Sequence, residues 1–125
     1  MTHRSAIRKI VIDVGGESEH DRAVAFWEGA TGQTLTQFDR YPEYHGAELP
    51  GTAIGLLVQR LGSGPNRVHV DIHSDDVGAE AARLEQLGAH RVEEHEHWTV
   101  MRDPAGLLFC VVIDHNLNDS NSHIW

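Results

Sequence analysis

The chain has 125 residues, of which 40% are apolar, which suits a single domain over residues 1–125 with a hydrophobic core of its own. The formal net charge of −9 disfavours a nucleic-acid partner, because binding a phosphate backbone needs a concentrated basic face. The lone cysteine, Cys110, excludes an internal disulfide. No apolar run is long enough for a spanning helix or a signal peptide, so we expect a cytoplasmic protein without membrane association.

The first half of the chain predicts the element order βαβββ. Alternation of apolar residues indicates strands, and apolar residues at helical spacing before Gly32 indicate a helix that ends at that glycine. The helical positions include Phe26 and Trp27, which we expect to face the core. The predicted elements are a strand over 7–14, a helix over 19–30, and strands over 34–38, 43–49 and 54–60.

The second half repeats that order after the linker at 61–66, whose sequence LGSGPN is rich in glycine, serine and proline. Asp75 or Asp76 is a candidate N-cap for the second helix, and Gly88 stops it. The predicted elements are a strand over 67–73, a helix through Leu87, and strands over 90–94, 98–102 and 107–113. The repeat indicates two duplicated modules, at about 7–60 and 67–114.

Residues 115–125 follow the second module and are interpreted as a C-terminal extension. The extension is polar apart from Leu117 and the terminal pair Ile124 and Trp125. We expect that exposed pair to be available for packing on a partner subunit.

The alternation also predicts which face of each sheet packs against a helix and which face lines a ligand site. In the first and fifth strands one set of residues is apolar and is expected to pack under the helices: Ile10, Ile12, Val14, Val68, Val70 and Ile72. The residues that alternate with them must then face the opposite side. There we place a mostly apolar ligand site with a few orienting polar groups, lined by Val11, Asp13, Leu57, Gln59, His69, Asp71, Trp98, Cys110 and Val112.

Three stretches resemble the glyoxalase/bleomycin-resistance/dioxygenase superfamily, also called vicinal oxygen chelate proteins. They are VIDV…AVAFWEGATG, NRVHVDIHSDD…EAARLEQLGA and WTVMRDPAGLLFCVV, which together span about residues 7–113. The resemblance implies an α+β fold of two tandem βαβββ modules, each a curved mixed sheet, that form a half-barrel cup. It also implies a small-molecule ligand and a homodimer.

The family's metal chemistry does not follow from this resemblance. Metal-dependent members such as glyoxalase I bind the ion through His or Gln on the first strand, Glu on the fourth, His on the fifth and Glu on the eighth. The matching positions here hold Lys9 or Val11, then Gln59, His69 and Cys110. Only His69 is a good ligand, so we expect no metal cofactor there, although Asp13 and Asp71 are possible substitutes.

Three functions from different classes remain open. The first is a binding protein that sequesters a small molecule. The second is a metal-independent isomerase or lyase with His69 and Asp13 or Asp71 as general acid and base, His69 and Asp71 being the catalytic candidates. The third is a metal-dependent lyase or dioxygenase. A purely structural hydrogen-bonding role competes with each, and we favour that role for His73; Cys110 is interpreted as a small buried hydrophobe.

Overall fold

The computed structural model describes residues 2–125 and divides into two compact units. The α1 unit is Lys9–His69, and the α2 unit is Val70–Trp125 together with the chain up to Arg8. The elements in chain order are β1 (Arg4–Val14), α1 (Glu17–Thr31), β2 (Thr36–Gln37), β3 (Tyr44–Glu48), β4 (Gly55–Arg60), β5 (Arg67–Ser74), α2 (Val77–Gln86), β6 (His90–Glu94), β7 (Trp98–Arg102), β8 (Leu108–Ile113) and β9 (His123–Ile124). The βαβββ order therefore occurs twice, which confirms the predicted α+β class and its repeat.

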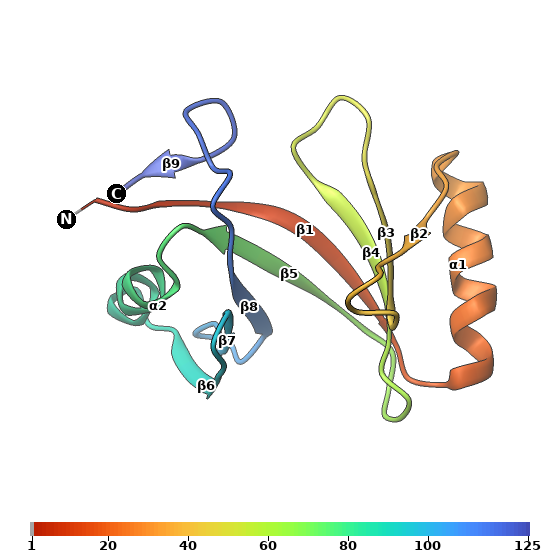
Figure 1. The fold of residues 1–125 in the computed structure, drawn as a ribbon. Coiled ribbons are helices and arrows are strands. Elements are labelled where there is room, and N and C mark those ends of the chain that lie inside the picture. The colour runs from red at the N-terminus through yellow and green to blue at the C-terminus, as the bar shows by residue number, and fades with distance from the viewer. Residues whose placement is uncertain (1) are drawn as a thin grey trace. The chain divides into compact units, whose positions relative to one another are not determined.

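In the α1 unit the strands are ordered β2-β3-β4-β1, with β1 parallel to β4 and the other neighbours antiparallel. Helix α1 packs against β4, as the orange helix and its neighbouring strands show in Figure 1. The core combines Val14 and Val58 with Ile12, Val24 and Trp27. The apolar side of the first strand therefore lies under the helix, as its alternation predicts.

Phe26 does not follow the predicted pattern, because 63% of it is exposed. Its ring makes an edge-on contact with Trp27, whose own side chain joins the core. A residue next to a core position on a helix points about 100° away from it, so two adjacent aromatic residues cannot both face the sheet. The prediction that both residues are core is therefore wrong for Phe26.

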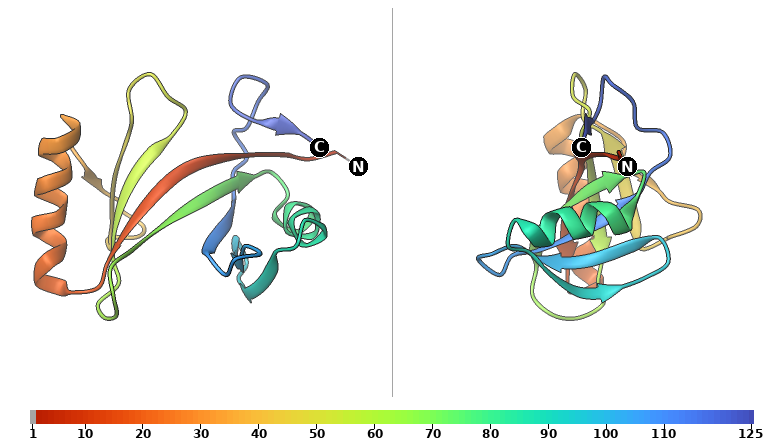
Figure 2. Two further views of the ribbon diagram at one scale, coloured as in Figure 1. Left: turned by 180° about the vertical axis from the view of Figure 1, so that it is seen from behind. Right: turned by 90° about the vertical axis from the view of Figure 1, so that its left-hand side faces the viewer.

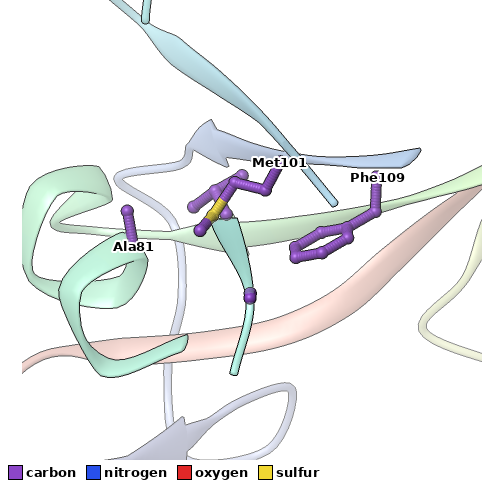
Figure 3. Packing of buried hydrophobic residues seen from close by; sticks show 5 residues of the cluster. Ala81, Met101 and Phe109 are labelled. Carbon is purple, nitrogen blue, oxygen red and sulfur yellow. The ribbon is translucent and has the colours of Figure 1, made fainter. Parts of the chain in front are cut away.

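The α2 unit repeats this arrangement with β5-β8-β7-β6, in which β5 and β8 are parallel. Helix α2 contacts β6, β7 and β8, and the right-hand view of Figure 2 shows it in front of β6 and β7. Figure 3 shows the core of this unit, a cluster that includes Ala81 of α2, Met101 of β7 and Phe109 of β8. Val70 and Ile72 pack against this cluster, as predicted for β5. The same prediction is wrong for Val68, of which 55% is exposed, because it lies near the start of the strand and joins neither core.

The ends of the helices use the residues that the sequence indicates. Asp76 is the N-cap of α2, since its Oδ1 accepts a hydrogen bond from the Ala79 backbone N–H at 2.9 Å. Gly32 (φ 71°) and Gly88 (φ 107°) follow α1 and α2 in the left-handed region, where glycine has no steric penalty. These caps fix where each helix stops relative to the next strand.

The last residues of the chain form a strand that the sequence analysis missed. β9 pairs antiparallel with the start of β1, with His123 opposite Ser5. The indole Nε1–H of Trp125 donates to Ser5 Oγ at 2.8 Å, and the Arg83 guanidinium lies 3.6 Å from the centre of a Trp125 ring. The terminal pair interpreted as a surface for a partner subunit therefore has contacts within its own unit.

Candidate functional site

The predicted site residues of the α1 unit lie on the side of the sheet opposite to α1. Val11 pairs with Leu57 across β1 and β4, and Asp13 pairs with Gln59 one step further along. Because Ile12 and Val14 face the helix, the alternation of the strand turns Val11 and Asp13 to the other side. Val11 and Asp13 are fully buried. A buried carboxylate beside a buried valine must be stabilised by specific polar partners.

Asp13 obtains those partners from the first residues of β5. Its Oδ2 lies 2.6 Å from Nδ1 of His69 and 3.2 Å from Nε of Arg67. An ionised carboxylate only accepts hydrogen bonds, so the His69 Nδ1 carries a proton and donates it to Asp13. The second oxygen, Asp13 Oδ1, is buried and has no hydrogen-bond partner among the described residues. The structure thus brings His69 and Asp13 into contact, and their joint action as acid and base stays a prediction.

The turn before β5 holds this pair in position. The backbone N–H of Gly15, directly after β1, donates to Asn66 Oδ1 at 2.9 Å. A Cβ on Gly15 would lie 1.7 Å from the carbonyl oxygen of Gly64, so only glycine allows the two segments to approach so closely. The linker is therefore fixed against the end of β1, and it delivers Arg67 and His69 to Asp13.

The predicted site residues of the α2 unit lie on the face opposite to α2. Asp71 pairs with Cys110 across β5 and β8, and Cys110 pairs with Val100 of β7. Trp98 pairs with Val112 and stacks on His95, with ring centres 4.2 Å apart. The thiol of Cys110 is free and only partly buried, because its strand neighbours Phe109 and Val111 take the core side.

His73 has a carboxylate partner of its own. Its Nδ1 lies 2.8 Å from Asp114 Oδ2 within the α2 unit. Burial alone would raise the pKa of Asp114, but the hydrogen bonds from His73 and from the Asn116 backbone outweigh it and hold the pKa below its ordinary value. The pair is partly exposed at both ends, with 14% and 16% of the two side chains accessible. It differs in this respect from the Asp13 pair, where the carboxylate is inaccessible.

Three of the family's four metal-ligand positions hold residues other than the usual ligands. Lys9 Nζ forms an ion pair with Glu48 Oε1 at 2.8 Å, and an ammonium group has no lone pair to offer a metal. The alternative first-strand residue, Val11, has no donor atom. Gln59 and Cys110 replace the two carboxylates that would offset the charge of a divalent ion. We therefore derive no chemical step through a metal at these positions.

Sequence reasoning missed a hollow of about 400 Å³ in the α2 unit. Its lining residues come from β1, β5, α2 and the chain end, among them Ile7, Ile72, Arg83 and Trp125. None of the predicted ligand residues lines it. The signal that could have located it is the apolar end of the chain, which returns to the start of β1.

Comparison with known proteins identifies the family. A family model described as a glyoxalase-like domain matches residues 9–112. The chain belongs to the glyoxalase-like domain family. This confirms the superfamily that the three sequence stretches indicate, and the match includes Asp13, His69 and Cys110.

Solved structures share the fold of this glyoxalase-like domain at low sequence identity. Methylmalonyl-CoA epimerase from Mycobacterium tuberculosis is 17% identical, with a TM-score of 0.59 over 86% of each chain. A protein titled NAD-dependent benzaldehyde dehydrogenase from Legionella pneumophila is 8% identical, with a TM-score of 0.62 over 84% of this chain and 96% of that one. 2,2',3-Trihydroxybiphenyl 1,2-dioxygenase from Sphingomonas wittichii strain RW1 is 12% identical, with a TM-score of 0.60 over 91% of this chain and 42% of that one.

At these identities the likeness shows the fold alone. No curated protein matches the chain. Neither helix of the part that the structure describes has the length and apolar character needed to cross a membrane.

Proposed function

We propose that this glyoxalase-like domain binds a small molecule and transfers a proton to or from it through His69, without the metal of its metal-dependent relatives. The observation that carries the proposal is the 2.6 Å contact between His69 Nδ1 and the fully buried carboxylate of Asp13. The reaction class that this supports is an isomerisation or elimination that begins with proton abstraction.

The pair has the features that a general acid–base histidine needs. Asp13 fixes the tautomer, because Nδ1–H donates to its Oδ2 and Nε2 becomes the ring atom that would exchange a proton with the ligand. The buried carboxylate also stabilises the imidazolium that forms when Nε2 takes a proton. His69 remains 12% exposed, so the ring is accessible while Asp13 behind it is not.

Arg67 balances the buried charge. Its Nε lies 3.2 Å from the same Asp13 oxygen, and half of the side chain is exposed. A buried carboxylate beside one neutral imidazole would be poorly compensated, and the guanidinium supplies a positive charge next to it. The carboxylate remains in contact with His69, which it orients.

Exchange of solvent deuterium into acidic carbon–hydrogen bonds tests the proposal without a known substrate. A panel of 2-oxo acids, acyl thioesters and hydroxy ketones is incubated with the protein in D₂O, and deuterium incorporation is followed by NMR. We expect exchange in at least one compound, and a decrease of about 100-fold or more in His69→Gln, which removes the base. His73→Gln is the matched control, because it removes the other histidine that is paired to a carboxylate, and it should keep the exchange rate.

Three results would contradict the proposal. Exchange that is equally fast in His69→Gln would show that this imidazole is not the base. Exchange that is abolished by a chelator and restored by a divalent ion would favour the metal-dependent alternative. Saturable ligand binding without any exchange would leave the protein as a binding module, with Asp13 and His69 as structural partners.

A further inference from the structure

A pair of histidines lies between α1 and β3, and neither belongs to the proposed acid–base pair of His69 and Asp13. His20 is the buried residue of α1, with 3% of its surface exposed, and His45 lies half-buried on β3. The centres of their rings are 5.0 Å apart and the ring planes are tilted by 56°. An imidazole in the most buried position of an amphipathic helix is unusual, because that position normally takes an apolar residue.

Each ring has a buried nitrogen without a hydrogen-bond partner among the described residues. These atoms are Nε2 of His20 and Nδ1 of His45. Nδ1 of His20 faces the Asp21 carboxylate at 3.5 Å, which favours a proton on Nδ1 and leaves a lone pair on Nε2. Burying such an atom without a partner is unfavourable, and native proteins rarely do so unless a ligand or water satisfies it.

The distance between the rings distinguishes the possible occupants. With bonds of about 2.0 Å to an ion at a tetrahedral angle, two imidazole centres are about 5 Å apart, which matches the observed spacing. A water molecule that bridges the same nitrogens through hydrogen bonds of about 2.9 Å would hold the centres about 6 Å apart. A direct hydrogen bond between the rings is not formed, because both nitrogens lack a partner.

We propose that His20 and His45 form a binding site for a divalent late first-row transition ion such as Zn²⁺. The two imidazoles supply nitrogen ligands from a helix and a strand that are fixed by the same core, and water completes the coordination. The Asp21 carboxylate lies 3.5 Å from Nδ1 of His20 and adds a negative charge beside the site, which favours a cation. The site is independent of the proposed proton transfer at His69.

A zinc titration of chelator-treated, untagged protein tests the site. Calorimetry at neutral pH should show one Zn²⁺ per chain, and Co²⁺ in its place should give the visible absorption of a tetrahedral site. His45→Gln should weaken zinc binding by about 100-fold or more, and His20→Gln should do the same. The matched control is His97→Gln, which removes an exposed histidine from the acidic segment around Glu96 and should leave this affinity unchanged.

The outcomes separate the proposal from its alternatives. No zinc binding by the wild-type protein would overturn it. Zinc binding that survives His45→Gln but is lost in His95→Gln or His97→Gln would also overturn it, since the ion would then sit on the exposed acidic segment. His45 is only half-buried, so His45→Gln decides the question even if His20→Gln fails to fold, as monitored by circular dichroism.

Discussion

The two helices of this repeated fold each bury one titratable side chain, but they treat it differently. Helix α2 buries Glu80 completely, and its carboxylate accepts hydrogen bonds from His3 at 2.8 Å and from two Arg83 nitrogens at 2.9 Å each. Helix α1 buries His20, whose Nε2 has no partner among the described residues. The same position in the two repeated helices can therefore hold a side chain whose polar atoms all have partners, or one with a polar atom left available for a ligand.

The difference separates structural roles from functional ones. Burial alone would raise the pKa of Glu80, yet the hydrogen bonds from Arg83 and His3 outweigh it and the pKa lies below its ordinary value. The Glu80 carboxylate is bound by partners within the protein. This arrangement is typical of a structural contact that holds a helix to the first residues of the chain. His20 and its neighbour His45 each keep one nitrogen unused, and these atoms are the ones to which we assign a metal ion.

The largest effect on stability is expected from removing the Glu80 charge, to which His3 and Arg83 bind. Glu80→Gln removes the charge that His3 and Arg83 bind, and it should lower the free energy of unfolding by about 3 kcal/mol. Urea unfolding at neutral pH measures this change. Glu96→Gln removes an exposed carboxylate and should change stability by less than about 0.5 kcal/mol. A loss below about 1 kcal/mol in Glu80→Gln would show that the network contributes little.

Lowering the pH should weaken the same network in the wild-type protein. The resulting loss of stability should not exceed the loss caused by removing the carboxylate in Glu80→Gln. The folded pKa values of Glu80 and Asp114 lie below their ordinary values, so the folded state holds fewer protons than the unfolded state around pH 4. Their stabilisation is complete above the ordinary pKa values and is lost as the pH falls through the folded ones. Unfolding measured at stepwise lower pH should show this decline, and the decline should be shallower in Glu80→Gln.

The sequence predicted the elements of this fold well because periodicity and glycine stops are local signals. The bounds of β5 and β7 and the stops at Gly32 and Gly88 follow directly from them. The pairing of β9 with β1 was missed because it joins residues about 120 positions apart, and a strand of two residues has no period to detect.

The site was predicted less completely, for a related reason. Alternation correctly turned Asp13 away from α1, and the alternation of the fifth strand assigned His69 to the same ligand-site face. Arg67 as a third member, and the contact of His20 with His45, depend on side-chain directions that a one-dimensional pattern does not contain. Glu80 and His20 both appear as ordinary polar residues on helices, and only burial reveals what they do.

The chain end provides a smaller test of the closed network. Trp125→Ala removes the hydrogen bond to Ser5 and the ring under Arg83, and it should lower the free energy of unfolding by about 1.5 kcal/mol. Ile124→Ala is the control, because that neighbour is equally exposed and keeps the backbone pairing of β9. Equal losses in both variants would mean that the indole itself contributes nothing specific.

The smallest effect on stability is expected at His20, whose Nε2 has no partner among the described residues. His20→Met replaces an imidazole that has an unsatisfied nitrogen with an apolar side chain of similar volume. In the presence of EDTA it should therefore change the free energy of unfolding by less than about 1 kcal/mol. Zinc at about 100 times its dissociation constant should stabilise the wild-type protein by about 2.7 kcal/mol and should leave His20→Met unaffected. Urea unfolding with and without zinc gives both values. A loss of more than about 3 kcal/mol in EDTA would place His20 in a closed network like that of Glu80, and the contrast between the two helices would fail.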